Sequence, residues 1–585
     1  MTSDNNVLRT PMQGTSSWAR RGSGVLNVRM LLIAALGLAL AALVLPPIAF
    51  LVQGSLYEHA LDGSATFSLS AYSELLSEGG VLRSFANSFL FAISSAVVAV
   101  IFGGVVAWIN ERTNAPFKPL AYITTFTSLG TPYILYISAW VMLIGRSSPI
   151  NVYYMQLTGA TTPLINAYSM ASMIFIEGLL WSPMVFLLLS ATLRNFNPEL
   201  EEAAKMCGAD GMKIFRRITL KLSMPAVMAL IMLVFIRSLE AFEVPAVVGT
   251  PGGIRMLTTD IYETLQEIPP DLGSASALSA CLLLVVALLL YFYGRMTRNA
   301  EQFATVTGKN FKPNTIDLGR WRWLAGAVLI GNFMILSVLP AAVLAWASFL
   351  PFYQAPSPAA FAVITLKNYI NVLHSSHYVQ LIANTLVIAS VSATAVMLLT
   401  SFVAWLRARR ASGSALLDSL ATMPLAFPGI IVGVAVMQLF LSVQVGIYGT
   451  IWIIVWAFVI SALPYGIRYS YAGMLQLHKE LEEAAVMSGA RPFVGFRRIV
   501  LPLLSPSLFA GWVFIFLLAA RVLSLPVLLS GPSSQTMAVA MFDLMSNGQT
   551  PELAALGLLW SLSMTALVVV FHLIARSKGV RIQGN

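Results

Sequence analysis

Charged side chains are scarce in this 585-residue sequence, in which Asp, Glu, Lys and Arg make up 10% of the residues and hydrophobic residues 57%. A soluble domain carries about 25% charged residues, so this composition excludes an ordinary soluble protein. Cysteine is nearly absent, because Cys207 and Cys281 are the only two and neither stands in a CxxC pair. Two such cysteines exclude a disulfide framework, and we interpret both as small packing residues.

The sequence also lacks the motifs of a nucleotide-hydrolysing or metal-dependent enzyme. Gly308-Lys309 has no upstream glycine and is followed by Asn310, so there is no GxxxxGK[ST] phosphate loop. No cluster of His, Cys or Asp predicts a metal site, and no catalytic constellation is visible. His374 and His377 share one polar loop, where we favour solvated side chains over a metal relay. We therefore expect no enzyme activity and no cofactor bound by this chain.

Long apolar runs are what the sequence has instead. A run of about 20 residues spans a bilayer, and only a helix satisfies its backbone groups there without water. The first run follows a basic leader, residues 1–29, and is too long for the core of a signal peptide, so we expect it to be retained. Twelve spans are predicted, near residues 30–53, 85–109, 120–144, 168–193, 222–245, 272–294, 323–349, 381–406, 417–443, 449–474, 504–527 and 553–575.

Positive charge alternates along the loops between these spans. Lys and Arg total 35 against 25 Asp and Glu, a net charge of +10, and they gather at the termini and in every second loop. This is the positive-inside distribution of membrane proteins, and it accounts for the net charge without a nucleic acid partner. It predicts that both termini are cytoplasmic, together with a polar linker over residues 295–322 and a tail over 576–585.

The chain contains an internal repeat, and its two copies cover residues 30–294 and 323–575. Residues recur at two constant offsets along the chain. At 297 positions, Leu69, Tyr72, Asn87, Ala107 and Trp108 recur as Leu366, Tyr369, Asn384, Ala404 and Trp405; at 281 positions, Pro183, Gly208, Phe215, Arg216 and Arg217 recur as Pro464, Gly489, Phe496, Arg497 and Arg498. An even number of spans in each half places both halves the same way up. This predicts a parallel repeat with a pathway at its interface.

One repeated block is polar and lies between the fourth and fifth spans of each half, at residues 198–221 and 479–502. Each copy reads Glu-Ala-Ala, three residues, Gly, nine residues, Ile, one residue, Leu. Asn197-Pro198-Glu199 is typical of a helix start, and Gly208 and Gly489 stand where that helix would end. The alanines keep the helix slim, so that a partner can approach closely. The block predicts a short helix–turn–helix on the cytoplasmic face, present twice and suited to a two-fold partner.

This spacing resembles the EAA loop of permeases from binding-protein-dependent ABC importers. The matching residues are Glu202, Ala203, Ala204 and Gly208 in the first half and Glu483, Ala484, Ala485 and Gly489 in the second. Lys221 departs from the pattern, which closes on a proline as Pro502 does, and we expect at most a looser exit from the first loop.

The resemblance implies a fold, partners and a location. The fold is all-α, with twelve transmembrane helices as two parallel six-helix repeats of the type I importer architecture. Each EAA loop is a coupling helix that sits in a groove of an ATPase subunit, and two copies of that subunit bind the ATP and Mg. A periplasmic binding protein delivers the substrate, and the chain is a multi-pass protein of the bacterial inner membrane.

Charge is costly inside a span and points to function, and we single out five charged residues there: Glu177, Arg237, Glu240, Glu243 and Arg521. Arg237 and Glu240 are three residues apart and can meet on one helix face. Glu240 and Arg521 are repeat counterparts, so one hypothesis makes them an outer gate between the halves, and the other pairs each of them locally. For Glu177 the two hypotheses are a role in the pathway and a hydrogen-bonded packing role.

The substrate is less readable than the fold. The segments 242–246, 249–253, 258–262 and 269–273 resemble the ferric-iron transport permeases, which implies ferric iron as the substrate. Permeases for thiamine, aminoethylphosphonate and polyamines are built similarly and remain alternatives. An ion-coupled secondary transporter also uses two repeated six-span halves, but the paired EAA loops argue against it. A membrane-embedded enzyme would need a catalytic constellation.

Overall fold

The computed structural model of the chain describes residues 18–59, 65–77, 79–194, 199–300, 315–443 and 445–577. These residues are mostly helical, as the sequence predicts. The strands among them form one antiparallel hairpin, β1 (Tyr57–His59) with β2 (Ala65–Phe67).

The first half contains these further elements: α1 (Trp18–Leu56), α2 (Ser70–Ser77), α3 (Gly79–Arg112), α4 (Pro119–Gly130), α5 (Tyr133–Ile144), α6 (Pro149–Thr158), α7 (Met170–Arg194), α8 (Glu199–Met206), α9 (Gly211–Ile214), η1 (Phe215–Thr219), α10 (Leu220–Leu239), η2 (Pro245–Gly249), η3 (Thr250–Gly252), α11 (Leu257–Gln266) and α12 (Leu272–Ala300). The second half contains η5 (Gly319–Trp321), α13 (Arg322–Phe333), η6 (Met334–Val338), α14 (Leu339–Ser348), α15 (Pro358–Ala362), α16 (Lys367–His374), α17 (Ser376–Ala408), α18 (Ser414–Thr422), η7 (Met423–Ala426), α19 (Gly429–Val443), α20 (Ile451–Leu475), α21 (Glu480–Met487), α22 (Pro492–Gly495), η8 (Phe496–Val500), α23 (Leu501–Arg521), α24 (Pro526–Leu529), α25 (Met537–Ser546) and α26 (Thr550–Ser577).

In the described part of the chain, ten helices are long and apolar enough to cross a membrane, and two bent helix pairs raise the count to twelve. The bent pairs are the third and ninth predicted spans, each of which the apolar pattern predicts as one continuous run. They turn by 109° between α4 and α5 and by 108° between α18 and α19. Prolines explain both breaks, because Pro132 and Pro428 directly precede α5 and α19 and a proline disfavours helix in the residue before it.

The internal repeat is visible in matching hydrogen bonds. The amides of Asn87 and Asn384 donate to the carbonyls of Arg255 and Gln535, each over 3.0 Å, so both hold the chain just before α11 and α25. Tyr72 and Tyr369 likewise pair with the hydroxyls of Ser55 and Ser348, at 2.9 and 2.8 Å. The repeated residues of the sequence therefore make equivalent hydrogen bonds in both halves.

The first helix of each half packs against the opposite half. Helix α1 lies against α18 and α19, and α13 and α14 lie against α4 and α5. Leu40 of α1 shares a buried cluster with Leu417 of α18, and Leu329 of α13 shares one with Ala121 of α4. Each bent span is thus held by the first helix of the other half.

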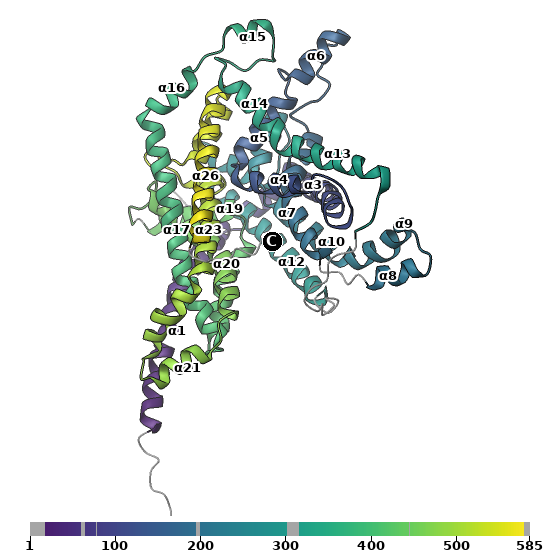
Figure 1. Cartoon of the computed structure of the whole chain (residues 1–585). Coiled ribbons are helices and arrows are strands. Elements are labelled where there is room, and N and C mark those ends of the chain that lie inside the picture. Colours follow the sequence, from purple (N-terminus) through teal and green to yellow (C-terminus); the bar gives the residue numbers. More distant parts are fainter. Residues whose placement is uncertain are drawn as a thin grey trace, which may run out of the picture.

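The two EAA blocks lie toward the same end of the molecule but on separate arms (Figure 1). Helices α8 and α9 lie at the right of that view, near mid-height, and α21 at the lower left, whereas α6, α15 and α16 lie at the top. We call the end with α8 and α21 the inner end and the opposite one the outer end, after the predicted sidedness. Near the inner end, Ile316 of the predicted linker donates its backbone N–H to the carbonyl of Arg112 at 2.8 Å.

Candidate functional site

The helix–turn–helix that the EAA spacing predicts is present in both halves. Gly208 and Gly489 follow α8 and α21 by two residues, and their φ angles of +78° and +83° are left-handed and favour glycine. The amides of Ala209 and Ala490 then donate to carbonyls five residues back, each over 3.0 Å. Both predicted glycine caps are confirmed, whereas the predicted start at Asn197-Pro198 lies outside the described residues.

The motif residues face outward on these helices. Glu202, Glu483 and both glycines are exposed. Of each alanine pair, Ala203 and Ala484 are exposed and Ala204 and Ala485 half-buried. A turn of π-helix follows in both halves, η1 and η8, and carries the repeated arginine pairs into α10 and α23. The element order is the same at Lys221 as at Pro502, so the departure from the motif leaves the exit from the first loop unchanged.

Two of the five charges predicted inside spans form an ion pair. Arg237 Nη1 lies 2.9 Å from Glu240 Oε2, which confirms the predicted contact between residues three apart. Glu240 therefore has a local partner, as one of the two hypotheses has it, and the gate between Glu240 and Arg521 stays a prediction. Glu177, which is 1% exposed, accepts a hydrogen bond of 2.8 Å from the Trp181 indole one turn along α7.

Three hydrogen bonds of these charged residues cross between the halves. Arg237 of α10 donates to the Tyr465 hydroxyl of α20 at 3.0 Å, and Arg521 of α23 donates to the Tyr133 hydroxyl of α5 at 2.8 Å. The Arg521 guanidinium also lies 4.5 Å from the centre of the Tyr133 ring. Glu243 accepts a bond of 3.3 Å from the backbone N–H of Leu523.

Sequence reasoning missed both tyrosines. A tyrosine in an apolar run carries no signal of its own, and the first-half partner reaches the interface only through the helix break. Tyr133 is the first residue of α5, directly after the bend. The corresponding first residue of α19 is Gly429, and a β-carbon there would lie 2.5 Å from the Ser524 hydroxyl. Only one half, then, has room for a tyrosine at this position.

An aromatic cluster joins the halves close to these contacts. The Phe242 ring lies 5.2 Å from the Tyr262 ring of α11 and 6.3 Å from the Phe542 ring of α25, and the last two rings are 6.4 Å apart. Phe542 belongs to the second half and the other two to the first. Because α11 and α25 follow the fifth span of each half, the cluster lies toward the outer end.

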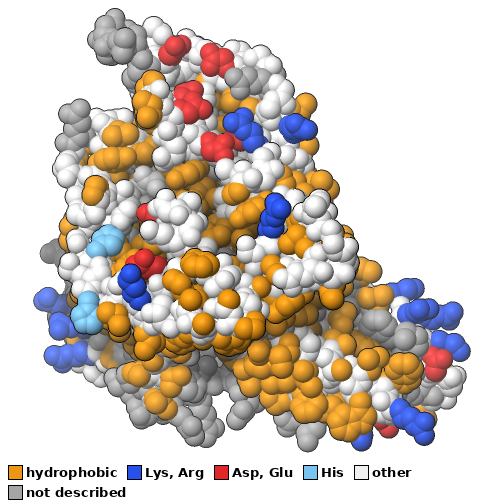
Figure 2. Space-filling view, turned by 90° about the horizontal axis from the view of Figure 1, so that it is seen from above, with side chains coloured by type: hydrophobic (Ala, Val, Ile, Leu, Met, Phe, Trp, Pro, Cys, Tyr) orange, Lys and Arg blue, Asp and Glu red, His pale blue; other side chains and the backbone are white. Residues whose placement is uncertain are grey.

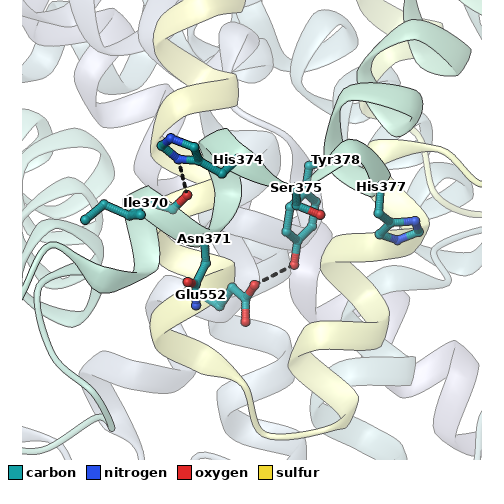
Figure 3. Close-up of a pocket in the computed structure, with 7 residues that line it drawn as sticks. All are labelled: Ile370, Asn371, His374, Ser375, His377, Tyr378 and Glu552. Atoms are coloured by element: carbon teal, nitrogen blue, oxygen red, sulfur yellow. Dashed lines mark hydrogen bonds between the residues drawn. The ribbon is translucent and has the colours of Figure 1, made fainter.

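The outer end also has an open pocket of about 450 Å³ where α16, α17 and α26 meet. Its lining includes His374 and His377, which lie on either side of the Tyr378 side chain (Figure 3). The Tyr378 hydroxyl donates to Glu552 at 2.8 Å, and His374 Nδ1 is 3.0 Å from the carbonyl oxygen of Ile370. The described residues contain no group of three His, Cys, Asp or Glu side chains placed to hold a metal.

The outer face around this pocket mixes apolar, neutral and charged side chains (Figure 2). Acidic side chains gather toward one edge of this face, and histidine side chains lie away from that edge.

The fold and the paired loops agree with the comparison to known families. The family described as "Binding-protein-dependent transport system inner membrane component" matches the chain twice, at residues 99–302 and 396–578. Each match contains one EAA block. The chain belongs to this family, and it is the permease of an ABC importer, as its EAA loops predict.

Three relatives show how far the similarity extends. The ferric transport system permease protein FbpB of Actinobacillus pleuropneumoniae is 25% identical over 87% of this chain and 73% of its own length. A probable ABC transporter permease protein, y4fN of Sinorhizobium fredii, is 25% identical over 92% of this chain and 94% of its own. The spermidine/putrescine permease protein PotC of Escherichia coli is 27% identical over 37% of this chain but 81% of its own length. A separate permease protein thus corresponds to less than half of this chain.

Proposed function

We propose that this chain forms the complete transmembrane pathway of its importer and is driven by two copies of a separate ATPase subunit. The observation that carries the proposal is the duplication of one exposed, glycine-capped helix, α8 and α21, toward the same end of both halves. Two equal docking helices suit a partner that is itself a pair. In this arrangement Glu202, Ala203, Ala204 and Gly208, with Glu483, Ala484, Ala485 and Gly489, contact the ATPase. Both termini then lie in the cytoplasm.

The substrate that the relatives favour is ferric iron, delivered from outside by a soluble binding protein. FbpB, a ferric transport permease by name, aligns over 87% of this chain, whereas the polyamine permease PotC aligns over 37%. The described residues supply no cluster of metal ligands. We therefore propose passage through the permease without tight chelation, with selectivity residing in the binding protein. Thiamine, aminoethylphosphonate and polyamines are the alternatives.

We further propose that the cross-half contacts close the pathway toward the outside. The bonds Arg237–Tyr465 and Arg521–Tyr133, with the Phe242, Tyr262 and Phe542 cluster, join the halves in this conformation. Opening toward the binding protein then requires these contacts to part. Glu240 holds Arg237 in place and Glu243 holds the backbone at Leu523, while Glu177 is bound by Trp181 within α7 beside the proposed pathway.

The test is to purify the chain from membranes in mild detergent and identify what accompanies it. We expect a stoichiometric ATPase subunit that is lost when Glu202, Gly208, Glu483 and Gly489 are changed together. Proteoliposomes containing both subunits and the binding protein should accumulate ferric iron with ATP, and spermidine, thiamine and aminoethylphosphonate serve as competing substrates. Transport by the chain alone under a proton or sodium gradient would instead establish a secondary transporter.

A further inference from the structure

Glu482 of α21 turns toward the transmembrane helices, although its neighbour Glu483 is exposed. Glu482 Oε1 accepts two hydrogen bonds from the Arg409 guanidinium, 2.9 Å from Nε and 2.6 Å from Nη2. Glu482 Oε2 accepts a third, 3.0 Å from the Trp405 indole nitrogen. Trp405 belongs to the inner end of α17, and Arg409 follows directly after that helix. Both carboxylate oxygens of Glu482 are therefore held by the end of one transmembrane helix.

This contact is sheltered from water. The side chains of Glu482 and Arg409 are 17% and 18% exposed, and Trp405 is 5% exposed. A second ion pair nearby, Arg407 with Asp418, is longer at 3.5 Å and has 40% and 35% of its side chains exposed. Charge-assisted bonds gain strength in shelter, whereas exposed ion pairs contribute little. Of the two, the Glu482 contact is the stronger mechanical link.

Trp405 also holds the second limb of the helix–turn–helix. Its ring lies 4.9 Å from the ring of Phe496, which is 2% exposed and is the first residue of η8. Phe402, one turn earlier on α17, lies 4.8 Å from the same ring. Arg409 additionally reaches the carbonyl of Leu477, before α21, at 3.4 Å. The loop is therefore attached to the inner end of α17 before the turn at Gly489 and again after it.

The residues that make these attachments are repeated in the first half. Trp108 and Arg112 stand 297 positions before Trp405 and Arg409, and Phe215 stands 281 before Phe496. Helix α3, which ends at Arg112, is the counterpart of α17. The Arg112 side chain is 1% exposed. Duplication of these residues indicates a requirement that both halves share.

We propose that Trp405, Arg409 and Glu482 are positioning residues that transmit movement of the ATPase from α21 to α17. The proposal rests on the proposed function, because it needs an ATPase at α21. Successive residues of a helix point about 100° apart, so two adjacent glutamates can serve two partners. Glu483 faces outward toward the ATPase, and Glu482 faces inward toward α17. A push on the helix is then carried into the membrane through a rigid contact.

The experiment compares variants of the complete complex in proteoliposomes, with substrate transported per ATP hydrolysed as the measured ratio. We expect Glu482→Gln to copurify with the ATPase in the wild-type ratio and to hydrolyse ATP, while the transport ratio falls several-fold. Trp405→Phe keeps a ring against Phe496 but removes the indole donor, so we expect its transport ratio to fall less than that of Glu482→Gln. Arg407→Gln is the matched control, since it removes an exposed ion pair near the end of the same helix, and its ratio should stay at the wild-type value.

Exchanging the two charges distinguishes a positioning role of the ion pair from a contribution to stability alone. The double variant Glu482→Arg with Arg409→Glu should recover part of the ratio that either single change loses. A wild-type ratio in Glu482→Gln would overturn the proposal, and so would loss of the ATPase from that variant, because Glu482 would then be a docking residue. Absence of an ATPase from the wild-type preparation would overturn the proposed function itself. The wild-type preparation is therefore analysed first, before any variant is made.

Discussion

Arg237 and Arg521 lie at the ends of apolar helices, where a guanidinium needs hydrogen-bond acceptors because water is scarce. Each finds a tyrosine hydroxyl of the opposite half, at 3.0 and 2.8 Å. An arginine stays charged when it binds a hydroxyl, and breaking that hydrogen bond costs less free energy than breaking an ion pair with a carboxylate. Such bonds suit a contact that must form and break in every cycle.

Removing these hydroxyls should loosen the outer closure. A hydrogen bond to a charged group contributes about 1.5–3 kcal/mol. We therefore expect Tyr465→Phe or Tyr133→Phe to shift the closed-to-open equilibrium by about 10-fold to 100-fold. The measurement is ATP hydrolysis by the reconstituted complex without binding protein, which should rise in both variants. Tyr369→Phe removes a hydroxyl that bonds within one half, to Ser348, and should leave the rate unchanged. Unchanged hydrolysis in both interface variants would count against the gate.

Asp260 of α11 offers a test by pH outside the membrane-spanning segments. Burial raises the pKa of this carboxyl, and its nearest cation, Arg255, lies 3.9 Å from Asp260 Oδ1. A raised pKa in the folded state means that the charged form destabilises the fold at neutral pH, and that this cost disappears as pH falls through the raised pKa. We expect Asp260→Asn to unfold at a higher temperature than wild type at pH 7. The difference should shrink as the pH falls through the raised pKa and wild type takes up the proton. A difference that grows on acidification would contradict this assignment.

At the scale of elements, α8 and α21 share the glycine turn that follows each of them. Gly208 and Gly489 hold left-handed backbone, and a β-carbon at either would meet no atom within 4 Å. Substitution there is therefore resisted by backbone conformation alone, without a steric clash. The same left-handed turn in both halves gives the two helices the same exit toward η1 and η8.

Replacing either glycine with alanine should destabilise the loop, whereas asparagine should be better tolerated. A left-handed conformation costs a residue other than glycine about 1–2 kcal/mol, and asparagine adopts it more readily. We expect Gly489→Ala to weaken retention of the ATPase during purification and Gly489→Asn to weaken it less. Gly331→Ala lies in right-handed helix with open space around it and serves as the control. Equal retention by Ala and Asn variants would show that backbone strain at the cap is unimportant.

At the scale of the whole molecule, the two halves touch at the outer end while α8 and α21 lie on separate arms (Figure 1). Tyr353 of the second half donates to the Met142 carbonyl of the first at 2.7 Å, and the aromatic cluster adds a further contact. The first helix of each half packs against the bent span of the other half. Such an arrangement lets the arms move about a joined outer end.

A cross-link at the aromatic cluster should stop the cycle. Cysteines would replace Tyr262 and Phe542, whose rings are 6.4 Å apart, in a background of Cys207→Ser and Cys281→Ala. We expect a short bifunctional reagent to join them within one chain, abolish transport and leave the ATPase bound. Reduction of a cleavable reagent should restore transport. Full transport by the cross-linked protein would mean that the cluster does not part.

The sequence by itself determined the class of protein, the twelve-span count and the helix–turn–helix of both EAA loops, because these depend on local composition and spacing. Apolar runs must become helices in a membrane, and a glycine cap follows from its own backbone. Only the tertiary structure decided which residues meet across the halves. The 109° break after Pro132 brings Tyr133 to Arg521, and the packing of α21 on α17 turns Glu482 inward from its neighbour. These contacts join residues 388 and 77 positions apart, so no local pattern encodes them and only the packing of helices brings them together.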